Sequence, residues 1–111
     1  MKTKKRLLIC GASGFIGQNL LRHFSGHPDF EVYAVCHLRA LSEGSLPEGV
    51  RVLEADLTKA EDVERIIRGA DVVLQAAAAT SGSAQIVAKP WLHVTDNAVM
   101  NSLLFLRRII I

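Results

Sequence analysis

The sequence predicts an α/β protein built on a parallel, doubly wound sheet. Three observations support this prediction. A glycine-rich turn follows an apolar run near the N-terminus, strand-like and helix-like segments alternate, and a length of 111 residues allows one domain, residues 1–111. Parallel strands need right-handed crossover connections. We therefore expect four strands in the order 3-2-1-4, with helices on both faces of the sheet.

A strand–turn–helix unit opens the chain. Residues 6–10 form the expected strand, and a helix over residues 14–25 follows. Between them, residues 11–17 read Gly-Ala-Ser-Gly-Phe-Ile-Gly. Such a turn is typical of a phosphate-binding site, because the helix start presents free N–H groups and the positive end of the helix dipole. The apolar face expected for this helix consists of Ile16, Leu20, Leu21 and Phe24.

Each of the three glycines has an expected role in binding a dinucleotide. Gly11 allows the tight turn, Gly14 lets the backbone approach the pyrophosphate, and Gly17 lets the helix pack against the strand. Phe15 and Ile16 belong to the same predicted site because they begin the helix. A structural turn without a ligand is the alternative interpretation.

Three further strands are expected after the first helix. Residues 30–36 alternate apolar side chains, residues 50–54 form a short third strand, and residues 71–77 form a fourth. The fourth is apolar throughout, which predicts burial on both faces. The segment 37–49 is a connection with room for one short helical turn. Together these strands constitute the first half of a Rossmann fold.

Two further helices complete the predicted alternation. One spans residues 59–68, with Thr58 as its N-cap, Glu61 as the capping-box partner, and Gly69 at its end. The other begins after Asp96, its expected cap. The apolar residues expected along these helices are Val63, Ile66 and Ile67 in the former and Val99, Leu103, Leu104 and Leu106 in the latter.

Composition argues against several classes of protein. The net charge of +2 arises partly from a basic cluster at the N-terminus, which we interpret as a solvated lead-in to the first strand and not as a nucleic-acid surface. No apolar run approaches the ~20 residues of a membrane helix, and no signal-peptide core follows the basic cluster. Cys10 and Cys36 end strands that are expected to pair, and we predict reduced thiols in the cytoplasm. Their surroundings support neither a nucleophile nor a metal site.

Four segments occur in an order typical of one enzyme family. They are the glycine turn 11–17, the pair Asp56-Leu57, residues 71–78 (similar to "DVVIHLAA", with Gln75 in place of His), and Asn97 with residues 100–104 (similar to "N-x-x-G-T-x-N-L-L", with Met100 and Asn101 in place of Gly-Thr). With these segments the chain resembles the extended short-chain dehydrogenase/reductases, in particular the NAD-dependent epimerase/dehydratase family acting on nucleotide-sugars.

The resemblance implies further cofactor-contacting residues. Asp56 would accept a hydrogen bond from the adenine amino group, and Leu57 would offer backbone and apolar contact. The small residues Ala76, Ala77 and Ala78 would let the backbone pass close to the ribose and nicotinamide, and Asn97 would lie near the nicotinamide end. Each has a structural alternative: a turn acid for Asp56, strand packing for the alanines, and a helix cap for Asn97.

The choice of cofactor depends on the residues that follow the second strand. NAD-binding folds usually place an acid there, about 20 residues past the glycines. Here the sequence reads Cys36-His37-Leu38-Arg39, without an acid. Cationic side chains attract a 2′-phosphate, which a carboxylate would repel. We therefore predict that NADP is preferred over NAD, with His37 and Arg39 near the phosphate; as the alternative, both are ordinary loop residues.

Catalysis in the resembled family needs residues that this sequence does not contain. A Tyr-x-x-x-Lys pair and a Ser or Thr handle the proton and the substrate, whereas the one tyrosine here, Tyr33, lies in the second strand. We assign no catalytic residue. The expected role is that of the NAD(P)-binding N-terminal part of a nucleotide-sugar epimerase, dehydratase or reductase, with a homodimer as one assembly. The alternative is a non-catalytic dinucleotide-binding sensor or regulatory module.

Two expectations concern the C-terminal third of the chain. The loop after the fourth strand is the expected place for substrate specificity, although Ser81, Ser83 and His93 there are more simply interpreted as solvent-facing polar residues. The chain stops in an apolar stretch, and its fourth strand lacks a further neighbour. These features favour a piece of a longer protein.

Overall fold

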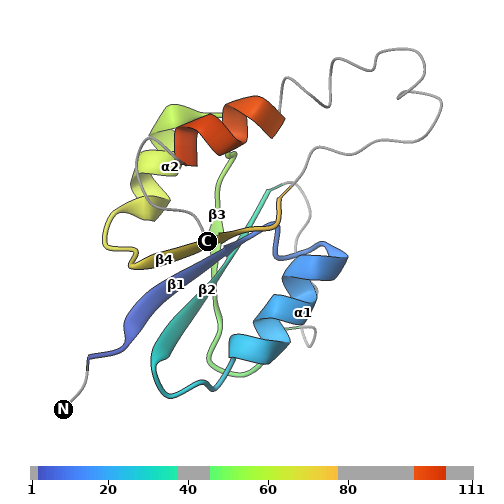
Figure 1. The fold of residues 1–111 in the computed structure, drawn as a ribbon, viewed down its shortest axis with the longest axis vertical. Coiled ribbons are helices and arrows are strands. Elements are labelled where there is room, and N and C mark those ends of the chain that lie inside the picture. The colour runs from blue at the N-terminus through green and yellow to red at the C-terminus, as the bar shows by residue number, and fades with distance from the viewer. Residues whose placement is uncertain (1–2, 38–45, 78–96, 105–111) are drawn as a thin grey trace.

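The computed structural model describes residues 3–37, 46–77 and 97–104. Strands and helices alternate in these ranges as the sequence predicts (Figure 1). Residues 97–104 are also helical. The labelled elements are β1 (Lys5–Cys10), α1 (Phe15–Phe24), β2 (Phe30–Cys36), β3 (Arg51–Glu54), α2 (Ala60–Ile67) and β4 (Val72–Gln75).

All strand pairs in the sheet are parallel, and the strand order is β3-β2-β1-β4, which confirms the predicted order. In the centre of the sheet, Leu8 of β1 is in register with Tyr33 of β2 and Val73 of β4. Because the strands are parallel, their carboxyl ends meet at one edge, which is where folds of this kind bind ligands.

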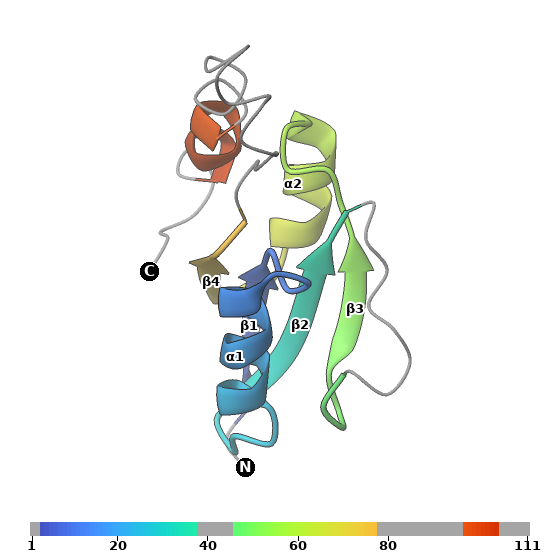
Figure 2. The ribbon, with the colours of Figure 1, turned by 90° about the vertical axis from the view of Figure 1, so that its right-hand side faces the viewer.

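The two faces of the sheet have separate cores, because successive side chains of a strand point to opposite sides. Leu7 and Ile9 of β1 pack with Leu21 of α1. Leu8 and Cys10 pack in the other cluster. Figure 2 shows α1 on one face and α2 with the helical residues 97–104 on the other. The members that these helices contribute to the second cluster are Val63, Ile66, Ile67, Met100 and Leu104. The prediction of helices on both faces is confirmed.

The apolar face of α1 differs from the predicted one at Ile16. Gly17 and Leu21 are buried, whereas the Ile16 side chain is 63% exposed. Residues four apart lie on one side of a helix, and each step of one residue rotates the side chain by about 100°. Because α1 packs on the sheet through the side that carries Gly17 and Leu21, the Ile16 side chain points away from the sheet. Gly14 and Ser25 are the two caps, as the predicted bounds imply.

The start of α2 differs from the predicted capping box. Lys59 is the N-cap and makes no side-chain cap hydrogen bond. The Thr58 hydroxyl donates instead to Asp56 Oδ1 at 2.6 Å. The acid that reaches back is Asp62, not Glu61: its Oδ2 accepts the Asp56 N–H at 2.8 Å. A nearby carboxylate thus outcompetes the helix end for the threonine hydroxyl. The burial predicted along this helix is confirmed.

The fourth strand is shorter and less buried than predicted. It spans Val72–Gln75, and only Val73 is fully buried. In the described sheet, β4 pairs with β1 alone, so one long side of the strand lacks a neighbour. In the helical residues 97–104, Met100 and Leu104 are buried. Val99, which was expected on the same apolar side of the helix as Leu104, is 37% exposed.

The two cysteines are both buried, and neither is in a disulfide. β1 and β2 pair as predicted, but Cys10 lies opposite Val35. Because side chains alternate along a strand, the Cys36 side chain points to the other face of the sheet. Burial raises the pKa of the Cys10 thiol to about 12, so this thiol is unreactive at neutral pH.

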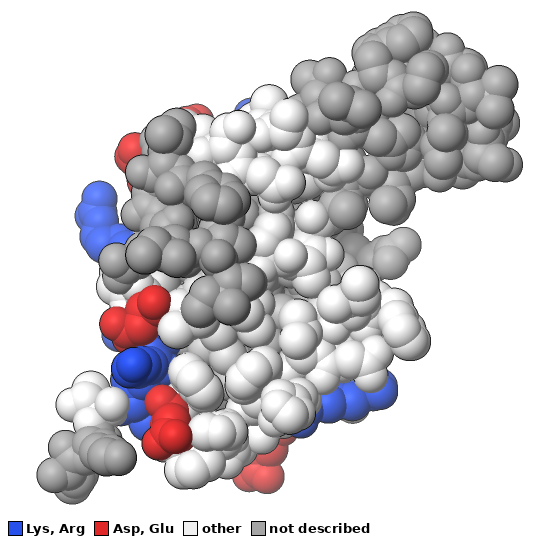
Figure 3. All heavy atoms as spheres, viewed as in Figure 1, with Lys and Arg blue, Asp and Glu red and all other residues white. Residues whose placement is uncertain are grey.

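Charged side chains are interspersed on the described surface. In the view of Figure 3, acidic and basic groups alternate along the rim, and the centre of this face is uncharged. Among its described residues, this face therefore carries no continuous basic stripe of the kind that nucleic-acid binding uses. The described helices are also too short or too polar to cross a membrane.

Candidate functional site

The glycine turn is anchored to the neighbouring strand. The N–H groups of Gly11 and Ala12 both donate to the Val35 carbonyl oxygen, at 3.1 and 3.2 Å. The Gly14 N–H donates to the Gly11 carbonyl, and α1 then begins with the Gln18 N–H bonded to Gly14 O at 2.9 Å. A helix leaves its first N–H groups without intrahelical acceptors. The turn therefore holds the positive end of α1 at the carboxyl edge of the sheet.

Gly11 and Gly17 occupy positions with no room for a side chain. Gly11 has φ +75°, and a Cβ added there would lie 2.5 Å from the Ala77 nitrogen. A Cβ on Gly17 would lie 2.0 Å from the Gly11 carbonyl oxygen and 2.8 Å from Ala12 Cα. The three atoms nearest to such a Cβ all belong to Gly11 and Ala12, so the closest contact of Gly17 is with the turn.

Gly14 is different, because no contact among the described residues requires a glycine there. Its φ of −80° is open to any residue, and an added Cβ would meet only Gly11 O, at 3.4 Å. The missing side chain leaves space on the outer side of the turn. Phe15 is 85% exposed, so both Phe15 and Ile16 direct their side chains toward solvent and can contribute only backbone amides to the turn.

The end of β4 forms one wall of the turn. The Ala76 N–H donates to Cys10 O at 3.0 Å, and the backbone of Ala76 and Ala77 lies against Gly11. Gln75 fixes this wall through two hydrogen bonds: its Oε1 accepts the Ala77 N–H at 3.0 Å, and its Nε2 donates to Asn101 Oδ1 at 3.1 Å.

The Gln75–Asn101 contact was missed in the sequence. Both residues stand where the chain departs from the motifs that it resembles, and the structure joins them across 26 positions. The sequence did show that both residues differ from their motifs. It could not show that they contact each other, because that contact depends on how residues 97–104 pack on the sheet. Asn97 is the first described residue of this helix and is half-buried.

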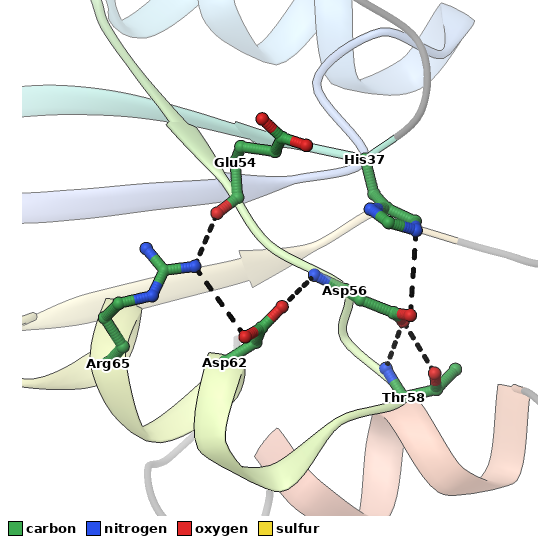
Figure 4. A network of polar contacts seen from close by, with 6 residues as sticks. All are labelled: His37, Glu54, Asp56, Thr58, Asp62 and Arg65. Carbon is green, nitrogen blue, oxygen red and sulfur yellow. Dashed lines mark hydrogen bonds and ion pairs between the residues drawn. The ribbon is translucent and has the colours of Figure 1, made fainter.

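A polar network occupies the ends of β2 and β3 (Figure 4). Asp56 Oδ1 accepts two hydrogen bonds from Thr58, from the N–H at 3.0 Å and from the hydroxyl at 2.6 Å. His37 Nε2 lies 3.6 Å from Asp56 Oδ2. The hydrogen bonds from Thr58, together with attraction to His37 and Lys59, lower the pKa of Asp56 in spite of its partial burial. Arg65 supports the network from α2, because its Nη2 donates to Glu54 O at 2.6 Å.

The structure brings the predicted site residues together in two groups along one edge of the sheet. The glycine turn, Ala76 and Ala77 form the first group, and His37 and Asp56 form the second. The Leu57 side chain is buried in the core on the α2 face, so its apolar contact goes to the protein. Two predicted residues, Arg39 and Ala78, lie outside the described residues, as do Ser81, Ser83, His93, Asp96 and Leu106. Within the described ranges, no three His, Cys, Asp or Glu side chains are arranged to hold a metal.

The lowered pKa of Asp56 predicts a pH-dependent contribution to stability. A depressed pKa stabilises the folded state above the pKa of the unfolded chain, and this contribution is lost as the pH falls through the folded pKa. We expect the difference in unfolding free energy between wild type and Asp56→Asn to be constant near neutral pH and to shrink below about pH 3.8. Urea titrations at several pH values measure it. Thr58→Val should weaken the pH dependence, and a difference that is unchanged down to pH 2 would contradict the assignment.

Fold and site together define a class of protein. A parallel sheet of order 3-2-1-4, with a glycine turn between its central strand and the following helix, is a Rossmann-like nucleotide-binding fold. The model of the NAD dependent epimerase/dehydratase family matches residues 7–106. The chain belongs to this family, as its motifs indicated. No curated protein matches the sequence significantly.

Solved structures of the same fold cover most of this chain. UDP-glucose 4-epimerase from Thermus thermophilus, solved in complex with NAD, is 29% identical with a TM-score of 0.72, over 89% of this chain and 32% of that one. The Thermotoga maritima enzyme, solved with UDP-glucose, is 22% identical with a TM-score of 0.75, over 92% and 33%. Uronate dehydrogenase from Agrobacterium tumefaciens is 21% identical with a TM-score of 0.70, over 92% and 35%. The chain therefore spans about a third of the length of these proteins.

Proposed function

We propose that this chain binds NAD(P)(H), with the pyrophosphate on the turn formed by residues 11–17, as the cofactor-binding part of an enzyme acting on a nucleotide-sugar. One observation carries the proposal. The turn is packed so tightly that Gly11 and Gly17 cannot hold a side chain, whereas no contact among the described residues requires Gly14 to lack one. A glycine without a structural requirement, at the start of a helix, leaves room for a phosphate against the backbone.

The second group of residues is placed to serve the adenosine end. Asp56 Oδ1 is saturated by Thr58, which leaves Oδ2 as the acceptor for an adenine amino group. His37 already faces this oxygen at 3.6 Å, so it shares Asp56 with any bound adenine. The proposed cofactor would thus lie along the carboxyl edge, from the Asp56 group to the glycine turn and on toward Ala77 and Asn97.

The proposed substrate class rests on kinship. The family model and the 29% identity to a UDP-glucose 4-epimerase favour a nucleotide-sugar. The cofactor would supply the hydride acceptor and donor for such a reaction. No Tyr-x-x-x-Lys occurs in the 111 residues. We therefore propose that this chain holds the cofactor and does not itself move the proton. Two buried cysteines without a disulfide are in keeping with the cytoplasmic location that we propose.

Isothermal titration calorimetry tests the proposal directly. NADPH and NADH are titrated separately into the purified chain, with AMP as a ligand that lacks the pyrophosphate and nicotinamide. We expect saturable binding with a stoichiometry of one, and tighter binding of the dinucleotides than of AMP. Failure of both dinucleotides to bind would contradict the proposal.

The preference for NADP gives a sharper prediction at His37. Replacing His37 with aspartate places a carboxylate at the end of β2, where it would bind the ribose hydroxyls of NADH and repel the 2′-phosphate of NADPH. We expect the ratio of the NADPH and NADH dissociation constants to rise at least about ten-fold, a change of roughly 1.4 kcal/mol. The control is His23→Asp, the same substitution on the exposed side of α1. Wild-type protein that binds NADH more tightly than NADPH would refute the predicted preference.

A further inference from the structure

A pocket of about 180 Å³ lies on the α2 face of the sheet, away from the glycine turn. Its apolar floor is formed by side chains of β1, β3 and α2, namely Leu8, Leu53 and Ile66. Arg6 lies on its rim, five residues before Gly11 along β1. At about 3.3 Å per residue, the two positions are roughly 16 Å apart along the strand. The pocket is therefore separate from the proposed cofactor site.

Three arginines converge on this pocket, and none of its lining residues is acidic. Arg6 comes from β1, Arg65 from α2, and Arg68 from the C-cap of α2. Arg65 is held by its hydrogen bond to Glu54 O and lies 3.9 Å from Asp62 Oδ1. In the part of the chain that the structure describes, neither Arg6 nor Arg68 forms an ion pair with a carboxylate.

The position of Arg6 depends on its neighbours. Its guanidinium carbon lies 5.9 Å from the centroid of the Tyr33 ring, a cation–π distance. On the other side, Gly69 adopts φ +82°, and a Cβ there would lie 3.1 Å from Arg6 Nη1. The ring and the glycine turn thus flank the guanidinium. The nearest acid by register is Glu31, which lies opposite Arg6 and accepts the Tyr33 hydroxyl at 2.8 Å.

We propose that this pocket binds a small polyvalent oxyanion, with two or more carboxylate or phosphate groups on a compact body. Guanidinium groups bind such oxyanions bidentately, and an anion among three of them would relieve the mutual repulsion of like charges. The apolar floor accepts the carbon skeleton of an organic anion. Carboxylate and phosphate ligands share this chemistry, and separate titrations distinguish them.

The test titrates citrate and pyrophosphate, one at a time, into the full chain by calorimetry, with wild type, Arg68→Gln and Arg22→Gln. Arg68 is exposed at the end of α2, so its replacement should not disturb the core. Arg22 is an exposed arginine of α1, on the other face of the sheet, and its replacement removes the same charge. We expect Arg68→Gln to weaken anion binding about ten-fold and Arg22→Gln to change it less than two-fold.

Three results would overturn the proposal. One is the absence of binding by either anion, and another is an equal loss in both variants, which would indicate a general charge effect. The third is loss of pyrophosphate binding when NADPH is saturating, which would place the anion on the glycine turn. Binding of citrate alone or of pyrophosphate alone supports the site and identifies its ligand as carboxylate or phosphate. The comparison of wild type, Arg68→Gln and Arg22→Gln needs no cofactor, so its outcome is independent of the proposed dinucleotide function.

Discussion

Replacing Gly17 with alanine is expected to destabilise the protein by about 3 kcal/mol or more, the upper range for overpacking a tight interior site. The added Cβ would lie 2.0 Å from the Gly11 carbonyl oxygen and 2.8 Å from Ala12 Cα. Neither atom belongs to a flexible side chain, so the whole first turn of α1 would have to move away from the glycine turn. Urea unfolding followed by circular dichroism measures the loss.

Gly26 provides the matched control for this experiment. It has φ +75°, and a Cβ there would meet no atom of the described residues within 4 Å. Gly26→Ala therefore carries only the backbone cost of a left-handed residue, about 1 kcal/mol. Gly11 has the same φ together with a steric clash, so Gly11→Ala should be the more damaging of these two. If Gly17→Ala costs no more than Gly26→Ala, the close packing of α1 against the turn is refuted.

Replacing Gly14 with alanine is expected to do the opposite: dinucleotide affinity should fall while the fold survives. The φ of −80° suits alanine, and the nearest atom to its Cβ would be 3.4 Å away. Alanine is a poorer N-cap than glycine, which costs up to about 1 kcal/mol. The methyl group would occupy the space proposed for the pyrophosphate. We therefore expect NADPH binding to weaken by at least about ten-fold, or roughly 1.4 kcal/mol.

Calorimetry on three proteins isolates this effect. Gly26→Ala should lose a similar amount of stability as Gly14→Ala and keep its wild-type affinity for NADPH, because Gly26 lies beyond the far end of α1. If Gly14→Ala binds NADPH as tightly as wild type, the pyrophosphate does not approach the turn at this residue.

The fold could be predicted because its signals are local. The apolar runs of β1 and β2, the glycines of residues 11–17, and the spacing of Val63, Ile66 and Ile67 each specify an element within a few positions. Parallel crossovers then leave few topologies. The need for glycine at Gly11 and Gly17 could be predicted for the same reason, because the spacing of the motif is set by the local backbone of the turn.

What the sequence did not reveal depends on contacts between elements. The exposure of Ile16 follows from the exact rotation of α1 on the sheet. Thr58 has the right type for a cap, but it bonds to Asp56, whose position is set by the end of β3. The pairing of Gln75 with Asn101 joins two motifs through the packing of a helix. Propensity and spacing carry no information on such contacts.

The most direct test of dinucleotide binding at the glycine turn is a titration of the ¹⁵N-labelled chain with NADPH, observed through its backbone amide resonances. We expect saturable shifts at Gly11, Gly14 and Gly17, with further shifts at Asp56 and Ala77, and unchanged resonances around Arg68. Shifts confined to the arginine pocket, or no saturable shift at the three glycines, would contradict the central claim that the turn of residues 11–17 binds the dinucleotide.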